Sequence, residues 1–358
     1  MKLLPGVVLL ACTPIALAQT YIVDAANGPG AHFTDMVTAI ATVPDGAELQ
    51  VRAGNYGSFT IGMGLSVSFE YLAVVDDVVV TGTLPQQTVE LRGLQSNSGT
   101  LSVTNCLGLV VLEECVGISG TGLTLNTFVC DQLYASLCRF GSTRFGASLF
   151  ATNAVFRGCQ FYGYLPLRTT ASRIQLVDSD VAAASIQPAL PSGPAIAMNG
   201  GDVRIVGGAC MAWQHPCISG TGSLRAHPNV AFTQMPVIIE PTIQTVVTEM
   251  PAVLALGGAL GGTVYAQMRG AADELGALLV GFPGPAVQLP GFSDPFWLQP
   301  GSAWTCAVET STSQWIANVA YPIPNAPAFR GLRLAWQAAT FRAANGLQAS
   351  NPAITTLW

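Results

Sequence analysis

Charge is scarce in this sequence. Only 9% of its 358 residues are Asp, Glu, Lys or Arg, against about 25% in an average soluble protein. Its one lysine is Lys2, so every other cation is an arginine, which limits any chemistry that needs a lysine amine. The net charge is -6 and no basic patch appears, which argues against nucleic acid as a partner. Half of the residues are hydrophobic, so the chain is not disordered.

Long hydrophobic runs suited to a membrane are also missing. Residues 250–268 and 275–292 carry no charge, but the first run holds four glycines and the second three prolines. Such residues interrupt a spanning helix. We therefore expect both runs to form buried strands with turns, and we expect no transmembrane segment once the N-terminal leader is removed.

The N-terminus resembles a secretory signal peptide. Lys2 precedes a largely apolar stretch, and Ala16 to Ala18 form an A-x-A cleavage site before Gln19. An alternative is lipoprotein-like processing at Cys12, which follows Leu-Leu-Ala. Either route predicts a secreted, extracellular or cell-surface protein. Cleavage after Ala18 leaves eight cysteines in an environment where disulfides persist.

A repeat of about 21 to 24 residues runs through the middle of the chain. Cys115, Cys138 and Cys159 recur at this interval, as do Cys106 and Cys130. The stretches between them are rich in Val, Leu and Phe and are broken by Gly, Asn and Ser. A period of this length indicates a solenoid in which each repeat is one coil of short strands. Cys115, Cys138 and Cys159 are then expected to stack inward as small, reduced, buried side chains.

Asparagine recurs as well: Asn105 and Asn126 lie 21 residues apart, and Asn153 follows in the next repeat. Asn tolerates the left-handed backbone conformation that tight turns require. These three residues therefore predict a stacked turn ladder.

The first coils carry a family resemblance. The segments DAANG (24–28), FTDMVTAI (33–40), PDG (44–46), LQVRAGNY (49–56) and FTI (59–61) resemble the start of pectin-lyase-like right-handed parallel β-helices. The resemblance covers about residues 20–233 and is specific for fold, whereas it says little about activity. It implies a short helix over the N-terminal end of the coil, for which Thr34 is the expected N-cap.

The pattern changes after Pro236 and Pro241. The repeat is lost, and short strands alternate with Pro-Gly turns, which is typical of a β-sandwich. The sequence thus predicts an all-β fold: a signal peptide (1–18), a right-handed parallel β-helix with a short N-terminal capping helix (19–235), and a C-terminal β-sandwich (236–358).

Enzymes that share the pectin-lyase-like fold have motifs that this chain lacks. A polygalacturonase-like site needs paired Asp residues, Gly-His-Gly and Arg-x-Lys. Here Asp76-Asp77 is the only Asp pair, no Gly-His-Gly occurs, and no lysine follows Lys2. The esterase-like Val-Asp-Phe-Ile-Phe-Gly is absent as well. The sequence therefore leans against an enzyme.

A lyase-like site finds partial support. Such a site needs carboxylates on neighbouring coils to hold Ca²⁺, with an Arg or Lys as base. Counting back from the cysteines places charged residues at one turn of successive coils, with further carboxylates near in sequence. The binding candidates are Glu113, Glu114, Arg157, Asp178, Asp180 and Asp202. They form either a carbohydrate groove, with Ca²⁺ as the one cofactor to consider, or a solvated edge on which opposite charges alternate.

The remaining cysteines predict disulfides. Cys210 and Cys217 flank a short loop that contains Pro216, so they are the first candidates, and Cys106 with Cys130 are the next. Together with His215 and His227, the first pair also offers ligands for zinc. The spacing does not fit a zinc finger, so we expect no bound metal there.

The sequence favours a secreted structural or surface-interaction protein without a recognisable catalytic motif. Extracellular polysaccharide or cell-surface components are its expected partners. The alternative is a polysaccharide lyase or glycoside hydrolase that acts in the β-helix groove. A further option treats the sandwich as a sorting or binding domain and the β-helix as its passenger.

Overall fold

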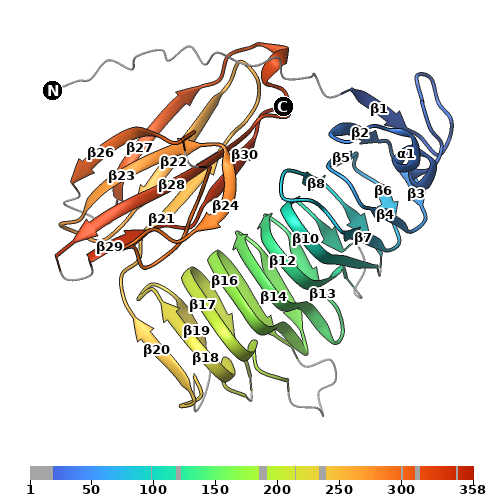
Figure 1. The fold of residues 1–358 in the computed structure, drawn as a ribbon. Helices are drawn as coiled ribbons and strands as arrows, with labels where there is room; N and C mark the ends of the chain where they lie inside the picture. The colour runs from blue at the N-terminus through green and yellow to red at the C-terminus, as the bar shows by residue number, and fades with distance from the viewer. Residues whose placement is uncertain are drawn as a thin grey trace.

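The computed structural model describes residues 19–97, 99–117, 122–184, 192–213, 215–233, 239–299, 301–310, 315–343 and 346–358. The predicted signal peptide and Cys12 lie outside these residues. Strands account for 63% of the structure and helices for 3%. A parallel β-solenoid of about nine turns is followed by antiparallel sheets (Figure 1). The predicted all-β fold is thus confirmed, with its solenoid and sandwich.

The described part of the solenoid contains twenty strands and one helix. In chain order they are β1 (Thr20–Val23), α1 (Met36–Thr42), β2 (Ala47–Val51), β3 (Gly54–Tyr56), β4 (Phe59–Ile61), β5 (Leu65–Phe69), β6 (Ala73–Val75), β7 (Val78–Thr81), β8 (Thr88–Arg92), β9 (Gln95–Ser96), β10 (Thr100–Glu113), β11 (Val116–Gly117), β12 (Thr124–Ser136), β13 (Arg139–Gly141), β14 (Phe145–Arg157), β15 (Gln160–Gly163), β16 (Leu165–Ala183), β17 (Ile196–Met211), β18 (Ile218–Ala226), β19 (Ala231–Thr233) and β20 (Ile243–Val247).

Alternating side chains build the solenoid core. In β5 the pattern Leu-Ser-Val-Ser-Phe buries every second residue, as a strand with one inward face requires. The parallel register then stacks inward residues of successive coils, for example Leu49 on Val67, Val67 on Leu91, and Leu91 on Leu112. All four side chains are buried. One continuous core therefore runs along the solenoid axis.

Helix α1 covers the N-terminal end of that core, as expected. Its N-cap is Asp35, whose side chain accepts a hydrogen bond from the Thr38 amide at 2.8 Å. The predicted cap at Thr34 is therefore wrong by one residue, because the carboxylate of Asp35 takes this role. Met36 and Ala39 are buried against the first coils, which shields the inward side chains from water.

The cysteine ladder is confirmed. Cys115, Cys138 and Cys159 are buried and unpaired, and the Cys115 amide lies 3.4 Å from Cys138 Sγ on the next coil. On the coil after Cys159 the same place is taken by Ser179, whose Oγ accepts from the Cys159 amide at 3.1 Å. Small side chains thus fill one inner corner of the solenoid.

The prediction that Asn105, Asn126 and Asn153 stack as a turn ladder is wrong. Asn105 has a positive φ, and the register places it beside Val129 and Ala151, which also have positive φ. Asn126 instead pairs with Ser102, in the middle of the strands. The left-handed bend does recur on each coil, but the surrounding ladder enforces it on residues other than Asn.

The solenoid extends beyond the predicted boundary at residue 235. β20 pairs in parallel with β18, and Ile239 bridges to Ile218. Of the two prolines at the predicted boundary, Pro236 lies outside the described residues, whereas Pro241 lies in the turn that precedes β20 and so belongs to the last coil. The connection to the sandwich therefore comes after Val247.

The remaining elements form the sandwich: β21 (Ala252–Leu256), β22 (Thr263–Arg269), β23 (Leu275–Gly281), β24 (Pro283–Val287), β25 (Phe296–Leu298), β26 (Trp304–Thr310), β27 (Trp315–Pro322), η1 (Pro327–Phe329), β28 (Arg333–Arg342), β29 (Gly346–Ala349) and β30 (Ala353–Thr356). One antiparallel sheet is β21-β22-β27, and another contains β26, β23, β28, β29 and β30. Their inner faces share an apolar core around Trp336 and Leu278.

The uncharged runs at 250–268 and 275–292 form strands β21 to β24, as expected. Across the described ranges, the structure has no helix with the length and apolar character needed to span a membrane.

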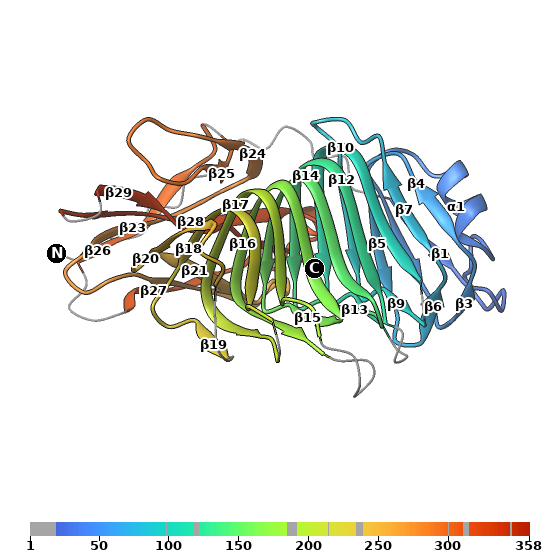
Figure 2. The same ribbon diagram turned by 90° about the horizontal axis from the view of Figure 1, so that it is seen from below.

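The sandwich lies along one flank of the solenoid rather than at its end (Figures 1 and 2). Leu109, Val111, Tyr134 and Val155 of the solenoid share a buried cluster with residues of the sandwich, among them Trp297 and Ile354. A second cluster joins Val177 and Val206 to Met250 and Ala252. The sandwich therefore covers this flank of the solenoid, and the other faces of the coils remain exposed to solvent.

Candidate functional site

The predicted charged column is only partly reproduced. Glu113, Ser136 and Arg157 lie in register on successive coils, as the count back from the cysteines predicts. The next position in this column is Val177 rather than Asp178. With Arg92, which lies in register before Glu113, the column therefore holds one carboxylate and two guanidinium groups.

Glu114 and Asp178 lie one residue further along their coils, at the bend. Both have positive φ, as do Leu137 and Gly158 at the equivalent places. The two carboxylates are thus three coils apart in the bend column, with an apolar residue and a glycine between them. They cannot share one small cation.

Asp180 and Asp202 lie away from these columns. Asp180 follows the bend, aligns with Gln160, and accepts a hydrogen bond from the Ala209 amide at 3.0 Å. Asp202 lies in β17 before the part of the strand that the sandwich covers. It pairs in register with Arg173, whose Nε lies 4.0 Å from its carboxylate, and the same carboxylate accepts a hydrogen bond from Ser223 Oγ. Of the six predicted site residues, only Glu113, Glu114, Arg157 and Asp178 share one edge.

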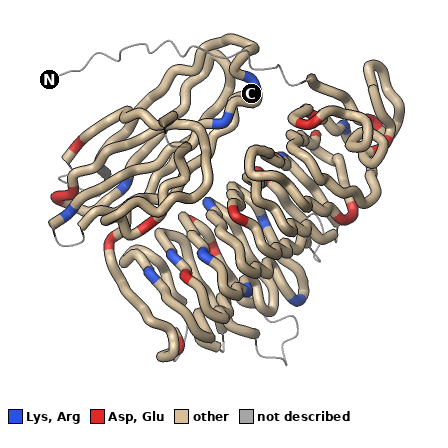
Figure 3. Tube along the Cα trace, viewed as in Figure 1, with Lys and Arg blue, Asp and Glu red and all other residues tan. Residues whose placement is uncertain are grey.

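The sandwich occupies that edge. Arg157 is only 8% exposed, and its Nη1 donates to the backbone oxygen of Ala255 at 2.9 Å. Asp178 forms an ion pair with Arg269 of β22 at 3.2 Å. Figure 3 shows charged positions along the solenoid flank that faces the sandwich. Arg157 and Asp178 therefore contact the second domain, whereas Glu114 on the same edge is exposed.

Glu113 has a partner within the solenoid. Its carboxylate lies 3.5 Å from Arg92, and the Arg92 guanidinium lies 4.9 Å from the ring centre of Trp358. Burial raises the pKa of Glu113, and the positive charge of Arg92 opposes that rise. Glu113 is thus linked to the C-terminal residue only through Arg92.

The neighbouring outward column lies under the centre of the sandwich. Its middle residues are apolar, and the residues at both ends are charged or polar. The residues that pair on successive coils to form it are Glu90, Val111, Tyr134, Val155, Gln175, Arg204 and Arg225. From Glu90 to Arg204 every member is buried. Sequence reasoning missed this column, because alternation alone cannot distinguish an outward residue facing water from one facing another domain.

Ion pairs close both ends of the column. At the N-terminal end, Arg333 Nη2 lies 2.6 Å from Glu90 Oε2. At the other end, Asp294 lies 3.4 Å from Arg204 and accepts from Arg225 Nη1 at 3.0 Å. Burial pulls the pKa of Asp294 upward, but the two arginines outweigh it and hold that pKa below its ordinary value. The interface thus keeps its buried charges paired.

The predicted site residues and the cysteine loop do not form a set of donor atoms for a metal ion in the described part of the chain. Within the ranges that the structure describes, no three His, Cys, Asp or Glu side chains approach closely enough to hold an ion. Ca²⁺ requires six to eight oxygen ligands, whereas the carboxylates of the predicted column are each engaged separately. The residues present therefore fit neither a calcium site in the column nor a zinc site at Cys210.

The cysteine pairs are close but not bonded in this structure. All eight described cysteines are free. Cys217 Sγ lies 3.2 Å from the backbone oxygen of Cys210, and Cys210 Sγ lies 3.7 Å from the backbone oxygen of Cys217. The interaction between the two side chains lowers the pKa of Cys217, whereas the same interaction and burial raise that of Cys210. Cys106 and Cys130 also lie in register. Both disulfides remain predictions.

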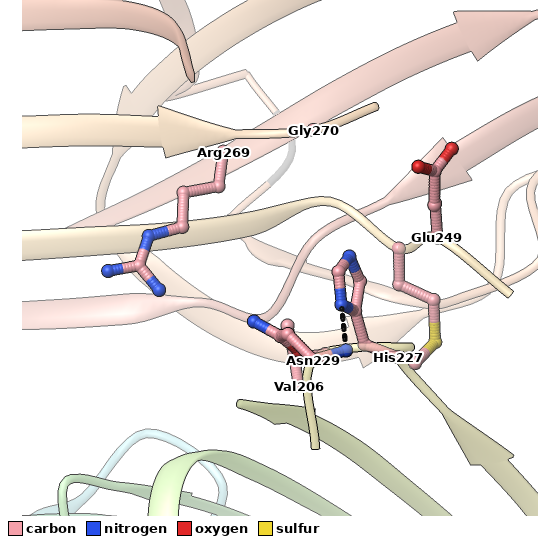
Figure 4. Close-up of a pocket in the computed structure, with 7 residues that line it drawn as sticks. Val206, His227, Asn229, Glu249, Arg269 and Gly270 are labelled. Atoms are coloured by element: carbon pink, nitrogen blue, oxygen red, sulfur yellow. Dashed lines mark hydrogen bonds between the residues drawn. The ribbon is translucent and has the colours of Figure 1, made fainter. Parts of the chain in front are cut away.

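A cavity of about 240 Å³ lies at the seam between the domains (Figure 4). Solenoid residues His227 and Asn229 line one side, and Glu249 and Arg269 approach from the linker and from β22. Burial lowers the pKa of His227, and its Nδ1 accepts from the Asn229 amide at 3.2 Å. Among the residues that line the cavity there is no hydroxyl, thiol or lysine amine, and its one carboxylate, Glu249, is held in the ion pair with Arg342.

The uncovered solenoid face carries an aromatic pair. Phe128 and Phe150 lie in register on β12 and β14, with ring centres 4.9 Å apart and planes 9° apart. They are 48% and 42% exposed. Thr104 precedes them in the column, and Thr170 and Asn199 follow. The sequence interval between the two phenylalanines matches the cysteine period and could have revealed this pair.

Comparison with known proteins leaves the family open. No protein-family model matches the chain, and no curated protein matches it. What the structure shows is a parallel β-helix whose charged flank is closed by a sandwich, and function must be argued from that geometry.

Proposed function

We propose that this is a secreted structural or surface-interaction protein that contacts polysaccharide and does not act on it. The observation that carries the proposal is the closure of the charged column by the sandwich. A lyase or hydrolase needs a carboxylate and a base that reach the substrate. Here Arg157 contacts the Ala255 carbonyl, and Asp178 contacts Arg269.

The open face supports the contact with polysaccharide. Phe128 and Phe150 place two parallel rings in a column that continues with Thr and Asn side chains. Aromatic rings offer large apolar contact areas, and a sugar ring has a C–H-lined face that packs against such rings. The hydroxyl and amide groups beside them can exchange hydrogen bonds with sugar hydroxyls.

The charge balance favours a weakly charged glycan. The chain has 13 arginines, since 14 Lys and Arg include Lys2. Eight of these arginines form ion pairs with carboxylates of the chain itself. A polyanionic glycan would therefore be repelled by the net charge of -6, and most arginines that could bind it already pair with carboxylates of the protein.

The extracellular setting of this proposal rests on the leader-like N-terminus. The first coils resemble the pectin-lyase-like superfamily, and the short helix over the first coil is what that resemblance implies. We assign the chain to this superfamily as part of the same proposal.

A glycan array tests the contact. We expect the wild-type protein to bind one or more weakly charged polysaccharides. Removing both rings in Phe128→Ala/Phe150→Ala should weaken binding about tenfold, which corresponds to about 1.4 kcal/mol. Phe341→Ala is the matched control, because Phe341 is 48% exposed on the sandwich. Equal binding by the double variant and the wild type would contradict the proposed surface.

A further inference from the structure

The two ends of the solenoid differ. Helix α1 covers the first coils, whereas the last coil ends at β20. Among the described residues, β20 pairs with β18 alone, and Figure 1 shows it as the outermost strand at this end. Solenoids usually need a cap at both ends.

Two of the three inward positions of β20 are open to water. Ile243 is buried in the core, whereas Thr245 is exposed and Val247 is 63% exposed. Thr245 and Val247 lie in register with Leu224 and Ala226, which are fully buried. The core therefore reaches water along the second half of this strand, because no further coil covers it in the part of the chain that the structure describes.

The free edge offers a row of backbone groups. The Thr248 amide donates to the Ala226 carbonyl, so Thr248 faces β18. Because residues of a strand alternate between its two edges, Thr245 and Val247 direct their N–H and C=O groups away from β18. An extended strand is the natural complement of such an edge.

The edge lacks the usual protection against pairing. Proteins block open edges with Lys, Pro, charges or bulges. Residues 242–248 read TIQTVVT, with no charge, proline or glycine. The stretch lies between Glu240, which accepts from the Gly220 amide, and Glu249, which pairs with Arg342. The strand itself therefore sets no carboxylate opposite a second copy.

We propose that β20 is a dimer interface at which two copies of this chain pair their last coils as antiparallel strands. A two-fold axis beside Thr245 sets that residue opposite its own copy and sets Ile243 opposite Val247. Such an interface is self-complementary, as two-fold symmetry requires. Head-to-tail stacking is blocked, because α1 covers the opposite end of the core.

Light scattering coupled to size-exclusion chromatography tests the dimer on the full chain. We expect the wild type at twice the chain mass of 37.2 kDa. Thr245→Lys should reduce the measured mass twofold, because it places a charge at the axis. Thr60→Lys is the matched control, since Thr60 is an exposed threonine in the middle of β4, and it should remain dimeric. A monomeric wild type, or a dimer unaffected by Thr245→Lys, overturns the proposal.

Cross-linking tests the register. Directly opposed residues of an antiparallel hydrogen-bonded pair have Cα atoms about 5.5 Å apart, which lies within the range of a disulfide. Thr245→Cys should therefore form a covalent dimer on mild oxidation, whereas Thr60→Cys should not. Failure of Thr245→Cys to cross-link overturns the pairing about Thr245.

Discussion

Arg333 of the sandwich reaches Glu90 of the solenoid, 243 residues away in sequence, with Nη2 2.6 Å and Nε 3.0 Å from Oε2. The side chain of Glu90 is only 6% exposed and that of Arg333 is 19% exposed. This fork therefore holds the N-terminal end of the covered column against β28.

Arg333→Ala should destabilise the protein by about 3–5 kcal/mol, because it leaves the Glu90 carboxylate buried without its cation. Chemical unfolding measures this loss. Arg330→Ala is the control, since Arg330 is exposed, and it should change the unfolding free energy by less than about 0.5 kcal/mol. Equal stability of the two variants would show that the fork does not hold the domains together.

Asp294 gives the interface an acid-sensitive end. Its pKa in the folded protein lies below the ordinary value, because Arg204 and Arg225 outweigh the effect of burial. A lowered pKa stabilises the fold above the unfolded-state value, about 3.9 for Asp, and that contribution disappears as pH falls through the folded pKa.

Asp294→Asn should therefore lower stability by about 3–5 kcal/mol at neutral pH, and the difference from wild type should shrink below about pH 4. Thermal unfolding of both proteins over this range tests the prediction. A difference that stays constant down to the lowest pH would mean that the charge of Asp294 is not the stabilising feature.

The sequence predicted the periodic features of the fold better than its charged column. Cys115, Cys138 and Cys159 are identical side chains in identical surroundings, so their spacing revealed the coil. The count to Asp178 failed because the next coil has Ser179 in place of a cysteine, and two residues before Ser179 is Val177. Recognising that serine as a ladder member would have corrected the register.

The domain contact could not be predicted in this way. Tyr134 and Val155 are outward residues of their strands, and a sequence does not reveal what lies opposite them. The partners of Glu90 and Asp178 come from β28 and β22, which no periodicity links to the coils. The sequence did not reveal that β20 belongs to the solenoid, because this uncharged strand lies between Pro241 and Pro251 and resembles a linker.

The covered column predicts how the isolated solenoid behaves. A fragment of residues 19–249 would expose Leu109, Val111, Tyr134 and Val155, which the sandwich buries. Exposed apolar patches of this kind promote association. We expect the fragment to aggregate in size-exclusion chromatography and the same fragment with Val111→Thr and Val155→Thr to aggregate less. A monomeric unmodified fragment would show that the sandwich is dispensable for solubility.

Cys210 and Cys217 should form a disulfide when the protein is produced in an oxidising compartment. Both are buried at the ends of a short loop, and each Sγ lies within 3.7 Å of the backbone oxygen of the other cysteine. Closing this loop should stabilise the fold by about 2–3 kcal/mol. Mass spectrometry of the alkylated, non-reduced protein detects the bond. Two free thiols at these positions would contradict this prediction, while Cys115, Cys138 and Cys159 should all remain free.

The central claim is that the charged flank joins two domains and does not process a substrate. An absorbance assay for unsaturated uronate products, run on pectin and alginate with and without Ca²⁺, tests it most directly. We expect no product from the wild type, because Arg157 and Asp178 face the sandwich. Calcium-dependent release of unsaturated product that is lost in Arg157→Ala would contradict the account.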